Sequence, residues 1–218
     1  MKRSKITILL AIVLGMTFHS CLDLEPQDQL GGKNMWTSVN DYKQFANTFY
    51  SWTRDFSSVV YDGTHSDKRS DLITYQSYNE FSRGINSIPS SDANYTDNYK
   101  HIRRTNLLLQ NAEAYAKPED IKQYIGEAYF FRAYSYFDLL QLYGDVIITK
   151  KPLDITDPEM KVKRNDRSEV VDLIIDDLNH AVENLPAFKE LTTEEEGRIS
   201  KEGAQAFLSR VALYEGTW

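Results

Sequence analysis

The sequence predicts an all-α protein in which long helices pair as antiparallel hairpins, with long irregular segments between some of them. Apolar side chains recur at intervals of three and four residues over several stretches, which is the period of one helical face. Capping residues, prolines and glycines bound these stretches, as they do at helix ends. Residues of hydrophobic type make up 41% of the 218 positions, which is sufficient for a sizeable core.

The first twenty residues are typical of a secretory signal peptide and not of the fold. Three basic residues within positions 2–5 precede Ile6–Phe18, an apolar stretch too short to span a bilayer. Cys21 follows the small residue Ser20, as in lipoprotein signals that are cleaved before a cysteine. We therefore expect lipidation at Cys21 and a tether over residues 21–33. The alternative is an ordinary signal peptide followed by a chance cysteine.

The charge of the chain argues against two classes of partner. The formal net charge is -7, and loss of the signal peptide would remove three basic residues and no acid. Nucleic acids and anionic lipids both require a basic face, so the acidic balance argues against binding to either. Attachment to a membrane is therefore expected to come from the lipid on Cys21. Cys21 is the only cysteine, so no internal disulfide is possible and the core must stabilise the fold.

The first predicted helix runs through Tyr42 to Tyr50. Ser38 and Asp41 have the spacing of a capping box at its start. Trp36, just before this box, is expected to pack back onto the helix.

Residues 51–98 are predicted to be irregular, because polar residues are dense and no helical or alternating period persists. Long irregular segments that carry aromatic residues are often functional. Aromatic rings bury the flat apolar surface of a ligand, while tyrosine adds a hydrogen-bonding tip. The candidate ligand-binding residues are Trp52, Tyr61, Tyr75, Tyr78 and Tyr95. The alternative is that these rings anchor the segment to the helices.

Two long helices follow. Helical spacing begins at Tyr99 and continues to Tyr115. Pro118 then begins a helix that ends before Gly144, where a residue without a Cβ suits the stop. The short link makes the two an antiparallel pair. The central helix is apolar most of the way round, so it must be sandwiched between other helices. The run 146–148 is expected to be extended.

A second hairpin is predicted after a polar surface connection over residues 154–164. Asp166 and Glu169 form a capping box for a helix that ends at Pro186. A charged loop leads to the last helix, Ala204–Tyr214, whose apolar face packs it against its partner.

The central segment resembles the signature helix of the SusD/RagB family. The family pattern E-A-x-F-x-R-A-x-x-Y-F-x-L-x-x-x-Y/F-G-D-V-P-L is matched at Glu127, Ala128, Phe130, Arg132, Ala133, Tyr136, Phe137, Leu139, Tyr143, Gly144, Asp145 and Val146, and Ile147 replaces the usual proline. The blocks 102–109, 170–186 and 197–214 also resemble family motifs. The resemblance implies a tetratricopeptide-like, SusD-type scaffold, although the sequence shows no clean 34-residue repeat.

The resemblance also implies a function. Members are surface lipoproteins of Bacteroidetes that capture nutrients for a SusC-like TonB-dependent outer-membrane transporter. The expected ligand is an oligosaccharide, glycan or peptide, and no cofactor is implied. Family members are longer, so residues 34–218 are expected to be an N-terminal helical domain truncated at its C-terminus. A scaffold without ligand binding is the alternative.

A hydrolase is the least favoured alternative. His65, His101 and His180 lie in separate segments, and no motif with metal-ligand spacing contains them. The acid runs Asp176–Asp177 and Glu194–Glu196 could be proposed as glycosidase carboxylates, but adjacent helical residues face different ways. We therefore expect no catalytic residues and no metal site. Arg132 is expected to be a structural cation paired with Glu127, Asp138 or Asp145.

Overall fold

A computed structural model describes residues 35–54, 83–154 and 156–217. The α-helices are α2 (Val39–Asn47), α3 (Ala93–Glu113), α4 (Lys122–Tyr143), α5 (Arg167–Asn184) and α6 (Lys201–Thr217). Short 3-10 helices are η1 (Thr48–Trp52), η4 (Pro118–Ile121), η5 (Pro158–Lys161), η6 (Phe188–Glu190) and η7 (Thr193–Glu195). Within the described ranges the one strand-like pairing is a bridge between Val146 and Asn165. The all-α prediction is confirmed.

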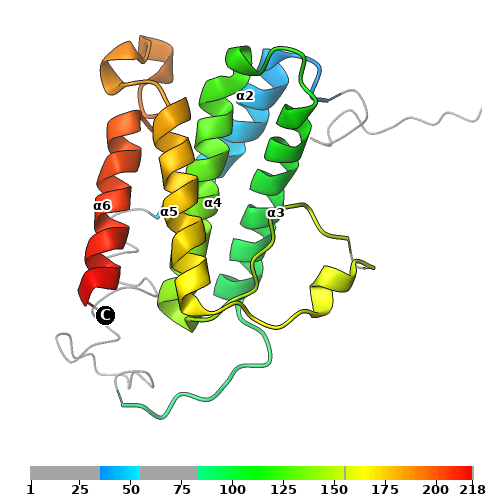
Figure 1. Cartoon of the computed structure of the whole chain (residues 1–218), viewed down its shortest axis with the longest axis vertical. Helices are drawn as coiled ribbons and strands as arrows, with labels where there is room; N and C mark the ends of the chain where they lie inside the picture. The colour runs from blue at the N-terminus through cyan, green and yellow to red at the C-terminus, as the bar shows by residue number, and fades with distance from the viewer. Residues whose placement is uncertain (1–34, 55–82, 155, 218) are drawn as a thin grey trace, which may run out of the picture. The chain divides into compact units, whose positions relative to one another are not determined.

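The helices α3, α4, α5 and α6 lie side by side in chain order, and successive helices run in opposite directions (Figure 1). They form the two predicted hairpins, α3–α4 and α5–α6. Helix α2 packs on α3 and α4. All five helices belong to one compact unit, Trp36–Trp218. None of the helices in the described part is both long and apolar enough to cross a membrane.

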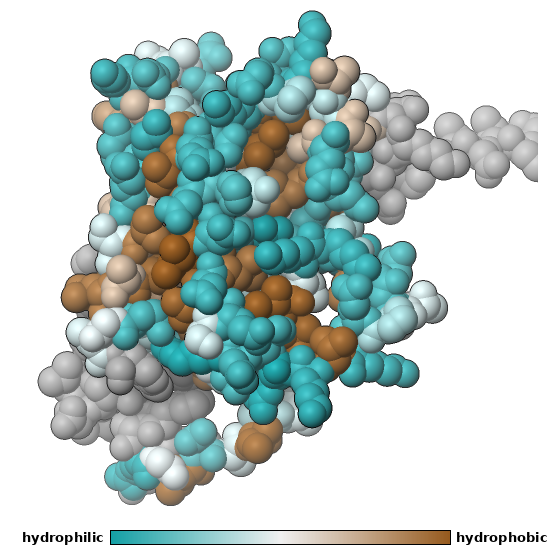
Figure 2. All heavy atoms as spheres, viewed as in Figure 1, coloured by the Kyte–Doolittle hydropathy of each residue, from teal (hydrophilic) through white to brown (hydrophobic). Residues whose placement is uncertain are grey.

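Helix α4 is the centre of the core, as its apolar sequence predicts. It packs against α3 and α5, and its aromatic rings also contact rings of α6. The Phe130 and Phe207 rings lie 5.5 Å apart, and the Phe137 and Tyr214 rings lie 5.4 Å apart. On the face shown in Figure 2, hydrophilic residues cover most of the surface and apolar residues lie between them. Helix α4, which is apolar most of the way round, is therefore covered by other helices on several sides.

The start of α2 confirms the predicted capping box. The Asp41 carboxylate accepts the Ser38 backbone N–H at 2.8 Å, and the Ser38 hydroxyl accepts the Asp41 N–H at 3.3 Å. Trp36 packs back onto the helix, with ring centroids 5.0 Å from Tyr42 and 4.7 Å from Phe45. Both partner rings are buried, so this contact closes the end of the core.

Helix α3 begins earlier than predicted, at Ala93 and not at Tyr99. The first turn is polar and gives no apolar period, so spacing alone misses it. The Asp92 carboxylate caps the turn by accepting the Asn94 N–H at 2.9 Å. The Tyr95 ring packs on Tyr99 and Tyr143. Local capping and ring packing therefore extend the helix into the segment predicted to be irregular.

Gly144 ends α4 with a φ of 69°, a conformation that side chains disfavour. The chain that follows is held by side chains of α3 and α4. The Tyr99 hydroxyl accepts the Ile147 N–H at 2.9 Å and donates to its carbonyl at 2.8 Å. Tyr136 accepts the Thr149 N–H at 2.7 Å, and Asn106 donates to the Thr149 carbonyl at 2.9 Å. Side chains therefore satisfy the backbone of this segment.

Two buried ion pairs join the hairpins, and the prediction for Arg132 was wrong about its partner. The Arg132 guanidinium donates to the two carboxylate oxygens of Asp177 on α5 at 2.6 and 2.8 Å. Glu127 instead pairs with Arg198, at 2.7 Å for each carboxylate oxygen. The Arg132 side chain lies at the contact between α4 and α5. It therefore reaches Asp177 on α5 and not a carboxylate on its own helix.

The other two predicted partners of Arg132 are also engaged elsewhere. Asp138 forms an ion pair with Arg54. The Asp145 carboxylate accepts the backbone N–H of Arg167 at 3.0 Å, at the first residue of α5. The capping role of Asp166 and Glu169 is confirmed, since the Glu169 carboxylate accepts the Asp166 N–H at 3.0 Å.

The contact between α4 and α5 requires a glycine at position 126. A Cβ built there would lie 2.9 Å from Leu185 Cγ and 3.1 Å from Asn184 Cβ. We expect Gly126→Ala to lower the free energy of unfolding by about 1–3 kcal/mol, since overpacking outweighs the better helix propensity of alanine. Urea unfolding measures this. Gly216→Ala on α6, where a Cβ meets nothing within 4 Å, is the control and should not destabilise the protein; equal losses would contradict the prediction.

Candidate functional site

A cleft beside Trp52 brings together residues from three elements. It has a volume of about 160 Å³. We call it the Trp52 cleft; its lining residues are Trp52, Arg54, Ala93, Asn94, Asp97, Asn98, His101, Tyr134 and Asp138. They come from the end of η1 and the chain just after it, the first turns of α3 and the second half of α4. Sites that enclose a drug-sized ligand have about 300–1,000 Å³, so this cleft would hold part of a ligand.

The polar side of the Trp52 cleft is built around Asp138, a buried carboxylate on α4. Arg54 forms an ion pair with it. The Asn98 amide donates to Asp138 Oδ2 at 2.8 Å and to the Asn94 carbonyl at 2.8 Å. A guanidinium, an amide and a carboxylate are therefore held in place beside an aromatic ring. Such groups can exchange hydrogen bonds with hydroxyl groups of a ligand.

The aromatic side of the cleft is less open than the sequence suggests. The Trp52 indole stacks on the His101 imidazole, with centroids 4.1 Å apart and an interplanar angle of 15°. Phe49 and Phe131 also contact the indole, at 4.7 and 5.9 Å. The imidazole covers one face of Trp52, so the ring serves partly as an anchor of η1. The anchoring interpretation therefore applies to Trp52, and its role in ligand binding stays a prediction.

Burial in this stack lowers the pKa of His101 to about 4; the Asp97 carboxylate acts against this shift, and the cations Arg104 and Lys100 add to it. The folded protein therefore keeps the ring neutral, whereas the unfolded chain binds a proton near pH 6.5. Stability is expected to fall as the pH drops from 6.5 to 4, because the unfolded state binds more protons there. Solvent screens this half-exposed ring, so we expect a loss of about 1 kcal/mol.

Urea unfolding at the two ends of this pH interval measures the effect. His101→Gln cannot titrate and should reduce the pH dependence by that amount. An unchanged pH dependence in His101→Gln would show that other groups cause it.

The structure places two of the five predicted ligand residues. Trp52 lines the cleft. Tyr95 does not, because it lies on α3 and packs between Tyr99 and Tyr143, at 4.8 and 5.2 Å. Its assignment to an irregular segment was wrong. Tyr61, Tyr75 and Tyr78 lie outside the described residues, as does the lipidation candidate Cys21, so their roles stay predictions.

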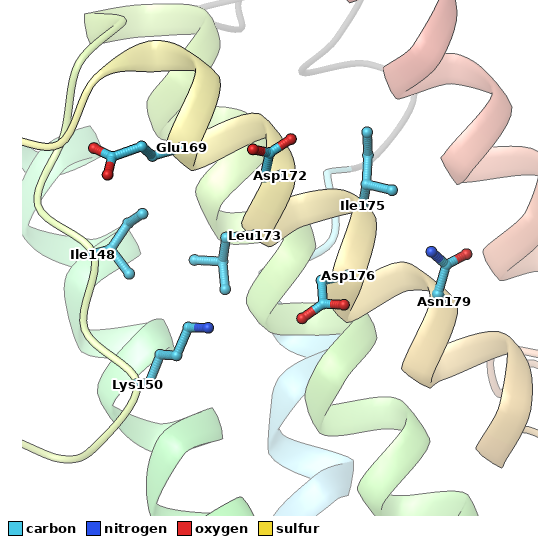
Figure 3. A pocket seen from close by; sticks show the side chains of 8 residues that line it. All are labelled: Ile148, Lys150, Glu169, Asp172, Leu173, Ile175, Asp176 and Asn179. Atoms are coloured by element: carbon cyan, nitrogen blue, oxygen red, sulfur yellow. The ribbon is translucent and has the colours of Figure 1, made fainter.

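A second hollow lies between α5 and the chain that follows α4 (Figure 3). It has a volume of about 390 Å³, and its lining residues are Ile148, Lys150, Glu169, Asp172, Leu173, Ile175, Asp176 and Asn179. Ile148 and Lys150 face Leu173 and Asp176 across it. The lining contains no aromatic residue. It is larger than the Trp52 cleft, but it offers no flat surface for a sugar ring.

Two of the acids considered for catalysis have structural roles. Asp177 is buried against Arg132, whereas its neighbour Asp176 is exposed and lines the second hollow. Glu195 accepts the Thr192 N–H at 3.2 Å as a cap of η7. Among the residues that the structure describes, no group of three histidine, cysteine or acidic side chains could hold a metal ion.

Sequence patterns missed the polar half of the cleft. Asn98 and Asp138 are 40 residues apart, and neither belongs to a local motif. Arg54 is an isolated basic residue before residues 55–82. No local spacing could have joined these three side chains, since the packing of α3 on α4 brings them together.

Comparisons with known proteins agree on one family. A family model described as SusD-like, starch-binding and associating with the outer membrane matches residues 22–213. The SusD-like protein P38 of Formosa agariphila is 28% identical over 98% of this chain and 42% of its own length. A crystal structure of a SusD-like protein from Bacteroides fragilis matches with a TM-score of 0.66 and 25% identity, over 87% of this chain and 37% of that one.

A laminarin-binding SusD-like protein of known structure matches with a TM-score of 0.56 and 31% identity, over 63% of this chain and 30% of that one. The chain thus spans less than half the length of these relatives.

Proposed function

Because this chain belongs to the SusD-like family, we propose that it binds oligosaccharides or other glycans at the cell surface and delivers them for uptake. In this proposal Cys21 carries the lipid that attaches the protein to the outer membrane. A SusC-like TonB-dependent transporter is the proposed partner, and a peptide is the alternative nutrient. The observation that carries the proposal is the family match over residues 22–213.

The Trp52 cleft supports a binding role without a covalent step. It combines an aromatic edge with a guanidinium, an amide and a carboxylate. The aromatic edge can bury the C–H surface of a sugar, and the polar groups can satisfy its hydroxyls. The cleft is small, so the proposal assigns it one part of a longer ligand. No catalytic role is proposed for its carboxylates, since Asp138 is already paired with Arg54 and Asn98.

One observation favours the second candidate, a scaffold that binds no glycan. The indole of Trp52 is covered on one face by His101 and also contacts Phe49. A ring used in this way stabilises the fold even without a ligand.

A glycan titration separates the two candidates. Purified protein is titrated with a panel of oligosaccharides, including laminarin fragments, and with peptides. We expect binding of at least one glycan, and a weakening of about five- to tenfold in Trp52→Ala.

Asp97→Ala alters the exposed rim of the cleft without disturbing the core and should also weaken binding. Phe188→Ala, an exposed side chain that does not line the cleft, is the control. Equal affinities in all variants would remove the cleft from the proposal.

The anchoring part of the proposal has its own test. The intact mass and surface labelling of the native protein are compared with those of Cys21→Ala. A diacyl or triacyl mass on the native protein alone, with exposure on the cell, is the expected result. An unmodified native protein would overturn the anchor and leave glycan binding to be judged separately.

A further inference from the structure

The connection between α4 and α5 carries a run of residues whose chemistry differs from the rest of the surface. We call Met160, Lys161, Val162, Lys163 and Arg164 the basic strip. These residues are all exposed; they belong to the end of η5 and the chain that follows it. In Figure 1 this connection stands away from the helices. The strip is basic on a protein whose formal net charge is -7.

The acids near the strip are already engaged by other groups. Glu159 pairs with Lys151 at 2.7 Å, and Asp154 pairs with Arg103 at 3.6 Å. Asp157 accepts the backbone N–H of Asp154 at 2.7 Å. In the described part of the chain, Lys161, Lys163 and Arg164 form no ion pair. The three cations of the strip are therefore free to contact an external group.

The two apolar members of the strip are exposed to solvent. Met160 is 51% exposed and Val162 is 47% exposed. They alternate with Lys161 and Lys163, so aliphatic and cationic side chains are interleaved. The strip therefore offers two aliphatic side chains beside its three cations.

The composition of the strip distinguishes between possible partners. A sugar polymer is usually held on flat aromatic rings, and residues 156–164 contain none. A lipid surface suits the strip better, because aliphatic side chains enter the boundary of the acyl region while lysine and arginine reach the phosphates. Each basic residue near an anionic membrane surface adds to the attraction.

We propose that the basic strip rests on an anionic lipid surface, with Lys161, Lys163 and Arg164 on lipid phosphates and Met160 and Val162 in the headgroup region. The inference rests on the outer-membrane association in the proposed function. The proposal departs from the expectation drawn from net charge, because the three cations of the strip are exposed and form no ion pair in the described part of the chain. The contact is salt-sensitive and supplements a lipid anchor, since the rest of the chain is acidic.

Vesicle flotation tests the proposal. The full chain carries Cys21→Ser, so that no lipid is attached to it, and is mixed with phosphatidylcholine vesicles with or without phosphatidylglycerol. We expect the triple variant Lys161→Gln, Lys163→Gln, Arg164→Gln to bind the anionic vesicles about tenfold more weakly at low salt and the neutral vesicles unchanged. Met160→Ser with Val162→Ser should weaken binding to the anionic vesicles as well.

The matched control removes three exposed basic residues from other parts of the surface, as Lys117→Gln, Lys189→Gln and Arg210→Gln. It has the same net charge as the triple variant and should retain most of the binding. Equal losses in the two triple variants, or none in the strip variant, would overturn the proposal. If the strip variant keeps vesicle binding but loses co-purification of a transporter, the strip contacts a protein and the proposal is also overturned.

Titrating the strip variant with glycans distinguishes a failure of the lipid contact from a failure of the proposed glycan binding. The strip variant should bind glycans like the parent chain. Loss of vesicle binding with intact glycan binding would support the strip alone, and the reverse would support only the glycan site.

Discussion

Replacing Arg132 by methionine is expected to lower the free energy of unfolding by about 3–5 kcal/mol. The Asp177 side chain is 1% exposed, and Arg132 supplies both of its charge-assisted hydrogen bonds at 2.6 and 2.8 Å. Without the guanidinium, a carboxylate is left buried and unpaired between α4 and α5. The variant also loses the donor to Oδ1 of the Asn106 side chain, at 2.8 Å, and the amide nitrogen of Asn106 in turn donates to the Thr149 carbonyl.

Urea unfolding followed by circular dichroism measures this loss. The control is the double variant Arg132→Met, Asp177→Leu, which removes both charges and should recover much of the stability, because a well-packed apolar pair can replace a buried ion pair. A double variant as unstable as Arg132→Met would show that packing, and not the unpaired charge, causes the loss. If Arg132→Met unfolds like the parent protein, the pair contributes little.

Replacing Arg198 by methionine is the second large expected effect, also about 3–5 kcal/mol at neutral pH. The Glu127 side chain is fully buried, and Arg198 donates to both of its oxygens. The guanidinium also lies over the rings of Tyr50 and Tyr124, at 5.3 and 5.4 Å. Its loss leaves the carboxylate without a cation and loosens the chain before α6.

The pH dependence of this variant identifies the cause. Burial raises the pKa of Glu127, and Arg198 acts against this rise. Removing Arg198 therefore raises the pKa further. A carboxyl whose pKa is higher in the folded state than in the unfolded state favours folding below the unfolded value, near 4.5, and loses this contribution as the pH rises.

The deficit of Arg198→Met should thus be smaller at mildly acidic pH than at neutral pH. The double variant Arg198→Met, Glu127→Gln removes the titrating group and should lose this extra pH dependence. A deficit that is the same at all pH values in the single variant would contradict the assignment to Glu127.

The helices and some of their ends could be predicted because their signals are local. The capping residues Ser38 and Asp41 lie three residues apart at the start of α2, and Asp166 and Glu169 do so at the start of α5. Gly144 indicates the end of α4. The start of α3 was missed because its first turn is polar and depends on a cap at Asp92.

The ion-pair partners could not be predicted from spacing. Arg132 and Asp177 are 45 residues apart, and Glu127 and Arg198 are 71 residues apart. The sequence places carboxylates on the same helix as Arg132, but helix packing decides which one the guanidinium reaches. The signature helix indicates the family, but the family pattern does not say which residues form the two ion pairs.

The candidate site, too, could be predicted only in part. Trp52 could be chosen by residue type, and the structure places it at a cleft. Tyr95 was chosen by the same criterion and lies in a helix. Asn98 and Asp138 meet only because α3 packs on α4, so no local pattern contains them.

The two buried ion pairs have a consequence for how the protein folds. Arg132 and Glu127 belong to the α3–α4 hairpin, whereas Asp177 and Arg198 belong to α5 and the chain before α6. A partly folded state with only the first hairpin formed would have to keep both groups hydrated, so it could not close its own core. Each hairpin therefore stabilises the other. We infer that α3 to α6 unfold together as one cooperative unit, and that intermediates with a single ordered hairpin are sparsely populated.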